Sequence, residues 1–327
     1  MKEQKEDIMK TPFKILIILL LPFYLFAFHD HEKTKSHHKH SALEQFLDST
    51  ENYLAYIYDG LNHTARFIDE TITGERSKHI YDENYIHVQS YYDVVQSAKN
   101  STGVNVRIKI KLPNLKEKYK LILENDDNKV ANEKYNDSTE TVDYKDDKYN
   151  LGLQYDTLKK DVNLKFKAGI KLRANSYAFL RASANKKFTM TDSWYFKVFE
   201  TLELNTKKNL ENTTAMNFYK DINKKLEFVN HNEYYWNEKD RIDNTYNSLR
   251  INQQLNHKNS LNYVAGLSSN DSSSNFQTKH YDAYIAFKQY IRPWLYYDVI
   301  PKVFWNRDNN FDAKYAFRFN LGIIIGK

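Results

Sequence analysis

The chain has 327 residues, of which 41% are hydrophobic and 28% charged, and its mean hydropathy is −0.75. This composition is too polar for a bundle of membrane helices, whereas a soluble domain or a β-barrel with a wet lumen fits it. The absence of cysteine excludes disulfides and thiolate metal sites. A net charge of +6, without a basic block interleaved with aromatics, argues against nucleic-acid binding.

Residues 1–28 are predicted to be a signal peptide. Lysines at the front of this segment precede the apolar run Ile15–Phe28, which is too short to span a bilayer comfortably. The small-residue cleavage pattern is poor, because Leu25 stands where a small residue is expected before Ala27. A retained inner-membrane anchor is therefore the alternative to a cleaved signal.

Residues 29–41 are predicted to be a histidine-rich linker. Neutral imidazoles can bind Zn or Cu ions weakly, but no rigid scaffold is evident here to fix a coordination geometry. We therefore expect a solvated linker rather than a metal site, and the sequence predicts no cofactor elsewhere. The histidines of this tract, which are the weak metal candidates, are His29, His31, His37, His38 and His40.

Residues 42–83 are predicted to be a periplasmic helix and linker. Apolar residues recur at intervals of three and four through 42–70, after Ser41 as a plausible N-cap. Such an amphipathic helix could pack on a barrel rim, enter the lumen or bind a periplasmic partner. Gly74 and several charges mark the linker that follows.

Residues 84–327 repeat stretches of alternating apolar and polar positions, separated by polar loops. In Val104–Leu112 every even position is aliphatic and every odd one is polar or cationic. This pattern is typical of an antiparallel transmembrane β-barrel of about 14 strands, with 12 as the alternative, and the high aromatic content suits interfacial girdles. The expected strands are 84–95, 102–113, 117–126, 147–156, 161–172, 176–187, 192–205, 209–222, 225–237, 244–256, 259–269, 277–290, 293–305 and 312–325.

Short and long connections alternate along most of this pattern, as periplasmic turns and extracellular loops should. The junctions near 173–176 and 189–192 are exceptions in length. Aliphatic positions are expected to face lipid, because a lysine or arginine at mid-membrane costs about 2–4 kcal/mol. The strands expected within 192–205 and 209–237 alternate less cleanly, and Glu200 lies among apolar residues in either register, so these strands are expected to contain a bulge or to face a subunit contact.

The other face of the strands would line the lumen. In an open pore its basic residues would favour anions, whereas charges paired across the lumen would close the barrel. The predicted pore-lining residues are Arg107, Lys109, Lys111, Lys165, Lys167, Lys171, Arg181, Asp282, Asp298 and Arg318.

The chain lacks the common hydrolase, nucleotide-binding and metal-binding motifs. His87 is the one candidate for a barrel enzyme acting on lipid, but nothing nominates a serine as its partner. We therefore expect a protein that is not an enzyme.

The segment Tyr281–Lys288, followed by Arg292–Val303, resembles the end of an uncharacterised family of proteobacterial outer-membrane barrel proteins. In that family a W-L-[FY]-[YF]-[ED]-x-x-P segment, here Trp294–Pro301, precedes the terminal strand. The resemblance implies a barrel and no particular activity. Outer-membrane proteins usually end on an aromatic residue that the assembly machinery reads. This sequence ends Ile323–Lys327, so that insertion signal is absent.

The sequence thus predicts a bacterial outer-membrane barrel that acts as a passive channel for small solutes, with anions as a candidate class. The alternative function is a closed, salt-bridge-plugged structural or partner-docking barrel without transport. Expected partners are outer-membrane lipid, the outer-membrane assembly machinery and a periplasmic protein bound through helix 42–70. A soluble periplasmic β-sandwich or solenoid is the alternative fold.

Overall fold

The computed structural model describes residues 42–79, 81, 83–115, 118–125, 149–239, 242–272 and 275–326. The predicted signal peptide, the histidine-rich linker with its five candidate metal ligands, and the Ser41 N-cap lie outside these residues, as does most of the long loop after residue 125.

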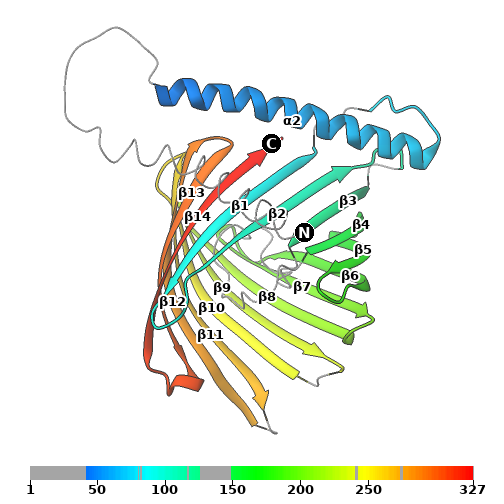
Figure 1. Cartoon of the computed structure of the whole chain (residues 1–327). Coiled ribbons are helices and arrows are strands. Elements are labelled where there is room, and N and C mark those ends of the chain that lie inside the picture. The colour runs from blue at the N-terminus through cyan, green and yellow to red at the C-terminus, as the bar shows by residue number, and fades with distance from the viewer. Residues whose placement is uncertain are drawn as a thin grey trace, which may run out of the picture. The chain divides into compact units, whose positions relative to one another are not determined.

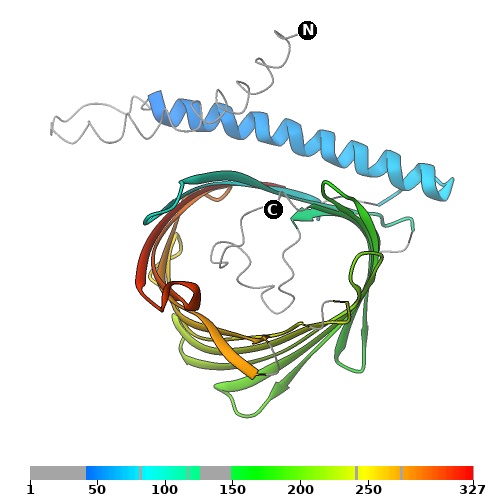
Figure 2. The same cartoon turned by 60° about the horizontal axis from the view of Figure 1, so that its bottom comes forward.

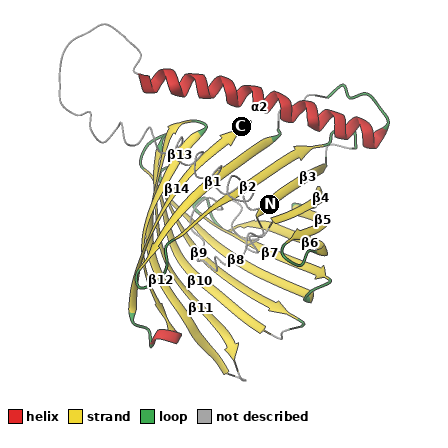
Figure 3. Cartoon of the chain, in the orientation of Figure 1, coloured by secondary structure: helices red, strands yellow, loops and turns green. Residues whose placement is uncertain are grey.

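In the described part of the chain, one long helix precedes fourteen strands that close into a barrel (Figures 1 and 3). The expected strand count of about 14 is confirmed, and each strand lies within a few residues of its predicted range. The elements are α2 (Ala42–Thr73), β1 (Tyr85–Val95), β2 (Ser101–Lys111), β3 (Tyr119–Asn125), β4 (Tyr149–Lys159), β5 (Val162–Leu172), β6 (Tyr177–Thr189), β7 (Trp194–Asn205), β8 (Asn209–Asn223), β9 (Leu226–Asn237), β10 (Ile242–Gln254), β11 (Asn259–Ser272), β12 (Asn275–Arg292), β13 (Leu295–Asn306), η2 (Arg307–Asn309) and β14 (Ala313–Ile325).

Each strand pairs antiparallel with its neighbours in sequence, and β1 pairs with β14 to complete the ring seen in Figure 2. The closing pair runs from Ile86 opposite Ile325 to Val95 opposite Ala316. Because no strand is left at an edge, the ladder satisfies backbone donors and acceptors without water. Closure excludes the β-sandwich and solenoid alternatives.

The alternation along each strand separates two faces, and exposure identifies them. Side chains on the concave face of a barrel crowd together, whereas those on the convex face splay apart. Lys171 and Asp298 are 1% and 0% exposed, whereas Leu180 and Tyr315 are 58% and 62% exposed. The charged positions therefore face inward and the aliphatic positions outward, as the sequence predicts.

The two junctions that were exceptional in length remain so in the structure. Residues 173–176 join β5 to β6 and residues 190–193 join β6 to β7, so these two consecutive connections are equally short and do not alternate between a long loop and a short turn. The predicted turn Thr157–Lys160 is wrong, because β4 continues to Lys159. The actual turn is Lys160–Asp161, both with positive φ (51° and 63°), the geometry of a type I′ hairpin whose twist matches the strands.

The register of β7 is continuous against both of its neighbours, and Glu200 opposes Ala184 on β6 and Thr214 on β8. No register shift therefore occurs at Glu200, but the bulge expected for the strands within 192–205 and 209–237 has a counterpart at Asp221/Asn223, where the register of β8 against β9 shifts. The register shifts that the structure does contain lie in the pairs β8–β9, β11–β12 and β12–β13. Glu200 consequently points outward with the aliphatic face.

The chain divides into two compact units, residues 1–56 and 57–327, so the second half of α2 belongs with the barrel. Ala65 packs in a buried cluster with Ile110 and Leu112, and Leu61 and Ile68 lie against it. Ile110 and Leu112, as outward aliphatic residues, were expected to face lipid. They are instead covered by the helix, because the apolar side of residues 61–68 finds its partner there. Among the described residues, no helix combines the length and the apolar character needed to cross a membrane.

Asp69, fully buried, fastens this half of the helix to the turn after β2. Its carboxylate accepts hydrogen bonds from the Tyr81 hydroxyl (2.9 Å) and from the backbone N–H groups of Asn114 (2.8 Å) and Leu115 (3.2 Å). Burial raises the pKa of Tyr81, which keeps its hydroxyl a donor. Asn84, also fully buried, links Asn62 (2.9 Å) to the backbone N–H of Lys111 (2.7 Å).

Replacing Asp69 with alanine should release residues 57–83 from the barrel, because it leaves buried donors unpaired at a cost of about 1–3 kcal/mol each. We expect faster protease cleavage between residues 74 and 83 with the barrel still folded. Asp59→Ala, at an exposed position of the same helix, is the control and should leave the cleavage rate unchanged. Equal cleavage of the two variants would contradict the fastening role of Asp69.

Gly322→Ala should destabilise the barrel. A methyl group at this inward position of β14 would overlap the ring of Tyr296, which is 0% exposed and cannot move aside. Overpacking of this kind costs about 1–3 kcal/mol, so the temperature at which the barrel loses its folded migration on gels should fall. Gly60→Ala is the control, because a Cβ there meets nothing within 4 Å and helix propensity improves.

Candidate pore lining

The register places all ten predicted pore-lining residues on the inward face. Lys111 on β2 opposes Lys120 on β3, and Lys167 on β5 opposes Arg181 on β6, so each strand continues the face of the previous one. Lys165 lies on the same face, opposite Asp156 and Ser183. The side chains do not form an uninterrupted cationic surface, however, because carboxylates lie between them.

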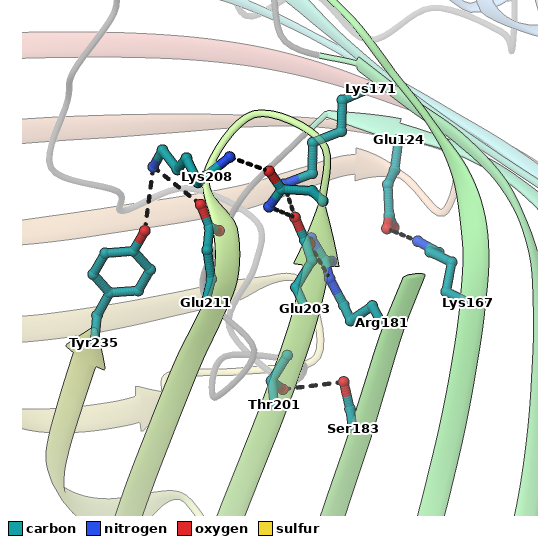
Figure 4. A network of polar contacts seen from close by, with 11 residues as sticks. Glu124, Lys167, Lys171, Arg181, Ser183, Thr201, Glu203, Lys208, Glu211 and Tyr235 are labelled. Atoms are coloured by element: carbon teal, nitrogen blue, oxygen red, sulfur yellow. Dashed lines mark hydrogen bonds and ion pairs between the residues drawn. The ribbon is translucent and has the colours of Figure 1, made fainter. Parts of the chain in front are cut away.

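Glu124 on β3 joins two of the predicted basic residues. Arg107 contacts it at 2.9 Å from β2, and Lys167 forms an ion pair with it from β5 (Figure 4). Lys167 is only 6% exposed. Glu124 is not among the residues predicted from the sequence, because Ile122, an aliphatic residue at an inward position, breaks the alternation of this short strand.

Glu203 on β7 forms the most buried cluster of the wall. Its carboxylate receives Lys171 at 2.5 Å and Arg181 at 2.5 Å, and the Asn205 amide donates to it at 3.0 Å. Lys171 and Glu203 are 1% and 3% exposed. Figure 4 shows Lys208 close by, with Glu211 and Tyr235 each 3.2 Å from its ammonium group.

Lys109 and Lys111 lie near the end of β2 and share Glu83, a residue that precedes β1. The hydrogen bond from Lys111 holds the pKa of Glu83 below its ordinary value, against the opposing effect of burial. Glu83 is half-exposed, so its ion pair with Lys111 contributes little to the stability of the fold and mainly offsets the positive charge of Lys111.

The remaining predicted residues pair on β12, β13, β14 and β1. Lys302 lies 3.4 Å from Asp282, and Lys288 lies 3.8 Å from Asp298. Arg318 on β14 contacts Asp93 on β1 at 2.6 Å, across the closing pair of strands. Asp282 and Asp298 are 2% and 0% exposed.

These ion pairs run along the wall. Lys171 and Glu203 come from β5 and β7, two strands apart, and the Asp282 and Arg318 pairs join adjacent strands. In the alternative of a salt-bridge-plugged barrel, charges would pair across the lumen. The pairs described here instead stiffen the wall and leave the opposite sides of the ring unconnected by them.

His87 lies beside an aromatic residue. Its Nε2 is 2.8 Å from the hydroxyl of Tyr296, to which the Gln89 amide also donates at 3.3 Å. This contact orients Tyr296 inside the wall of the barrel. Among the residues that the structure describes, no group of three or more histidine or acidic side chains could hold a metal ion.

No family model matches this chain, and no curated protein matches it. Among solved structures, the chain is similar to OmpT, an outer membrane protein of Vibrio cholerae, with 8% identity, 74% of this chain and 97% of that one covered, and a TM-score of 0.47. The KdgM porin in complex with disordered oligogalacturonate has 8% identity, coverages of 72% and 98%, and a TM-score of 0.36. The NanC porin has 10% identity, coverages of 54% and 93%, and a TM-score of 0.36. Similarity this low identifies neither a family nor a solute.

Glu203→Gln should destabilise the barrel, because Lys171 and Arg181 would lose the charge that compensates them in a buried cluster. Breaking one partner of such a cluster costs about 3–5 kcal/mol. The denaturant midpoint of the refolded barrel would report the loss. Glu211→Gln is the matched control on the next strand: its partner Lys208 is 29% exposed, so the loss there should be much smaller. Equal midpoints for the two variants would contradict this account.

Proposed function

We propose that this chain is a bacterial outer-membrane β-barrel that acts as a passive channel for small solutes, with a preference for anions. The observation that carries the proposal is the closed ring of fourteen strands, apolar outside and charged inside. Hydrocarbon accepts only structures whose backbone groups are all paired, and a closed barrel meets that condition. A strand of 11–15 residues, tilted by about 40°, spans the apolar part of such a membrane.

The width of the ring supports passage of water and small solutes. With strands about 4.8 Å apart and tilted by about 40°, a ring of fourteen has a backbone diameter of about 28 Å. Long side chains extend about 6–7 Å from each wall, which leaves about 15 Å between them. The wall alone therefore does not fill its own lumen.

The charges on the wall support the preference for anions. On β2–β7 the inward lysines and arginines outnumber the inward carboxylates, even after the ion pairs are counted. The basic residues are Arg107, Lys109, Lys111, Lys120, Lys165, Lys167, Lys171, Arg181, Lys187 and Lys197, and the acidic ones are Glu124, Asp156 and Glu203. This face of the lumen should attract anions, because any ion in the space of about 15 Å between the side chains lies within about one Debye length of the wall at 0.1 M salt.

The Trp294–Pro301 segment supports membership in the barrel family that it resembles. Trp294 lies in the turn before β13, and Tyr296 and Asp298 point inward, where both are 0% exposed. The aromatic and acidic residues of the motif thus lie in the inner wall, where Tyr296 contacts His87 and Asp298 faces Lys288. The motif has a structural role within such a barrel, and we propose the membership on that ground.

The first half of α2 supports a second proposal, that the helix binds a periplasmic partner. Phe46, Tyr53 and Tyr56 are 46%, 65% and 75% exposed and recur at helical spacing, and an exposed apolar patch of this kind is a candidate interaction surface. Deletion of residues 42–56 should abolish the partner complex and leave the barrel folded, because Asp69 and Asn84, which fasten the helix to the barrel, lie outside the deleted segment.

Insertion of the barrel by the outer-membrane assembly machinery also belongs to the proposal.

The pore proposal is tested with two triple variants, measured in planar bilayers under a salt gradient. Lys165, Lys187 and Lys197 face inward, and replacing all three with glutamine should lower the ratio of anion to cation permeability several-fold in 0.1 M salt. Lys159, Lys186 and Lys220 face outward on neighbouring strands, and the same replacement there should leave the ratio unchanged. At 1 M salt the difference should nearly vanish through screening. A wild-type protein that inserts without conductance would overturn the channel.

A further inference from the structure

The outward face carries polar residues midway along one group of strands. Midway along most strands the outward residue is apolar, as in Val106, Leu153, Phe166, Ala182, Ala265, Ile285, Val299 and Phe319. On β7 and β9 the corresponding positions hold Glu200, and Asn230 with Asn232. On β10 the two outward residues nearest the middle are Asn247 and the apolar Leu249, and on β8 the apolar Met216 lies midway. We call Glu200, Asn230, Asn232 and Asn247, with Asn212 and Thr214 on β8, the polar belt.

Glu200 is the centre of the polar belt. Its carboxylate accepts hydrogen bonds from the Thr214 hydroxyl at 2.7 Å and from the Asn212 amide, both on β8. The two donors are neutral, so they orient the carboxylate without balancing its charge. Such a group has capacity for further hydrogen bonds, and Glu200 is partly exposed on the convex side.

The asparagines extend the polar belt across the next two strands. The Asn232 amide donates to the Asn230 side chain at 2.7 Å, and Asn232 opposes Asn247 on β10. All three are partly exposed. An asparagine amide offers both donors and acceptors, and this row could therefore pair with a carboxylate or with another row of the same kind.

Hydrocarbon cannot satisfy these groups. Polar and ionisable residues at mid-membrane are costly unless they face protein or water, and side-chain hydrogen bonds between membrane segments stabilise association. Ser90, the polar residue midway along β1, differs because its hydroxyl donates to the Leu321 carbonyl. The polar belt spans four strands, with the apolar side chains of Met216 and Leu249 among its members, and a lipid acyl chain would leave its polar groups without partners.

We infer that the polar belt is the interface with a second copy of this chain, related by a two-fold axis along the membrane normal. Copies inserted in one direction can be related only by an axis normal to the membrane, so the belt of one meets the belt of the other at the same depth. Across that axis the asparagine row of each copy can donate to Glu200 of its partner. A single polar surface suits this isologous pair, whereas a ring of three would need two different surfaces.

The inference rests on the proposed membrane insertion, and single cysteines test it because the chain has none of its own. Met216→Cys places a thiol within the polar belt, midway along β8 and 38% exposed, without removing any of the belt's polar groups. Ile285→Cys is the matched control, 43% exposed and outward at the middle of β12. Both variants are oxidised in intact outer membranes and run on non-reducing gels.

Met216→Cys should give a disulfide-linked band at twice the monomer mass, and Ile285→Cys only a trace. Adding Glu200→Leu to Met216→Cys should lower that band roughly fivefold, the factor that corresponds to about 1 kcal/mol for membrane hydrogen bonds. Equal bands for the two cysteines, or an adduct of another mass, would overturn the self-association. Recovery of both variants in the soluble fraction, without a heat-dependent shift on gels, would instead overturn the membrane barrel itself.

Discussion

The pairing of the first strand with the last is the constraint on which the other features depend. In hydrocarbon an unpaired backbone donor or acceptor costs several kcal/mol, so a sheet with two free edges is not stable there. The contact between β1 and β14 removes both edges at once. Once the ring is closed, every strand side chain faces either the lumen or the surroundings, so the alternation in the sequence assigns each strand residue to one of these two faces.

Closure also brings charged residues of distant sequence into contact. Asp93 and Arg318 are neighbours only because β1 and β14 are paired. Lys171 reaches Glu203 past the whole of β6, which the concave curvature makes possible. Ion pairs of this kind hold the side chains against the wall. A lumen with such a wall keeps its charges fixed in position, which is the condition for a steady electrostatic preference.

Two places on the outward face differ from a surface that simply faces lipid. Ile110 belongs to the aliphatic face, yet the second half of α2 covers it, and Asp69 and Asn84 fasten that cover to the first strands. Glu200 also belongs to the outward face, where it is supported by neutral donors of the same chain and not by a cation. The outward surface is therefore not a uniform boundary with lipid.

The amino-acid pattern alone predicted about fourteen strands, their positions to within a few residues, and the inward face of the ten expected pore-lining residues, because a period of two is a local property of the chain. It predicted the helix from apolar residues at intervals of three and four, which are equally local. The tertiary structure alone decided which charges pair, since Glu124, Asp156 and Glu83 meet their lysines through strand register and not through spacing. It also decided that Glu200 points outward without a bulge and that Ile110 is covered. Register and packing join residues that are distant along the chain, and no local pattern encodes those distances.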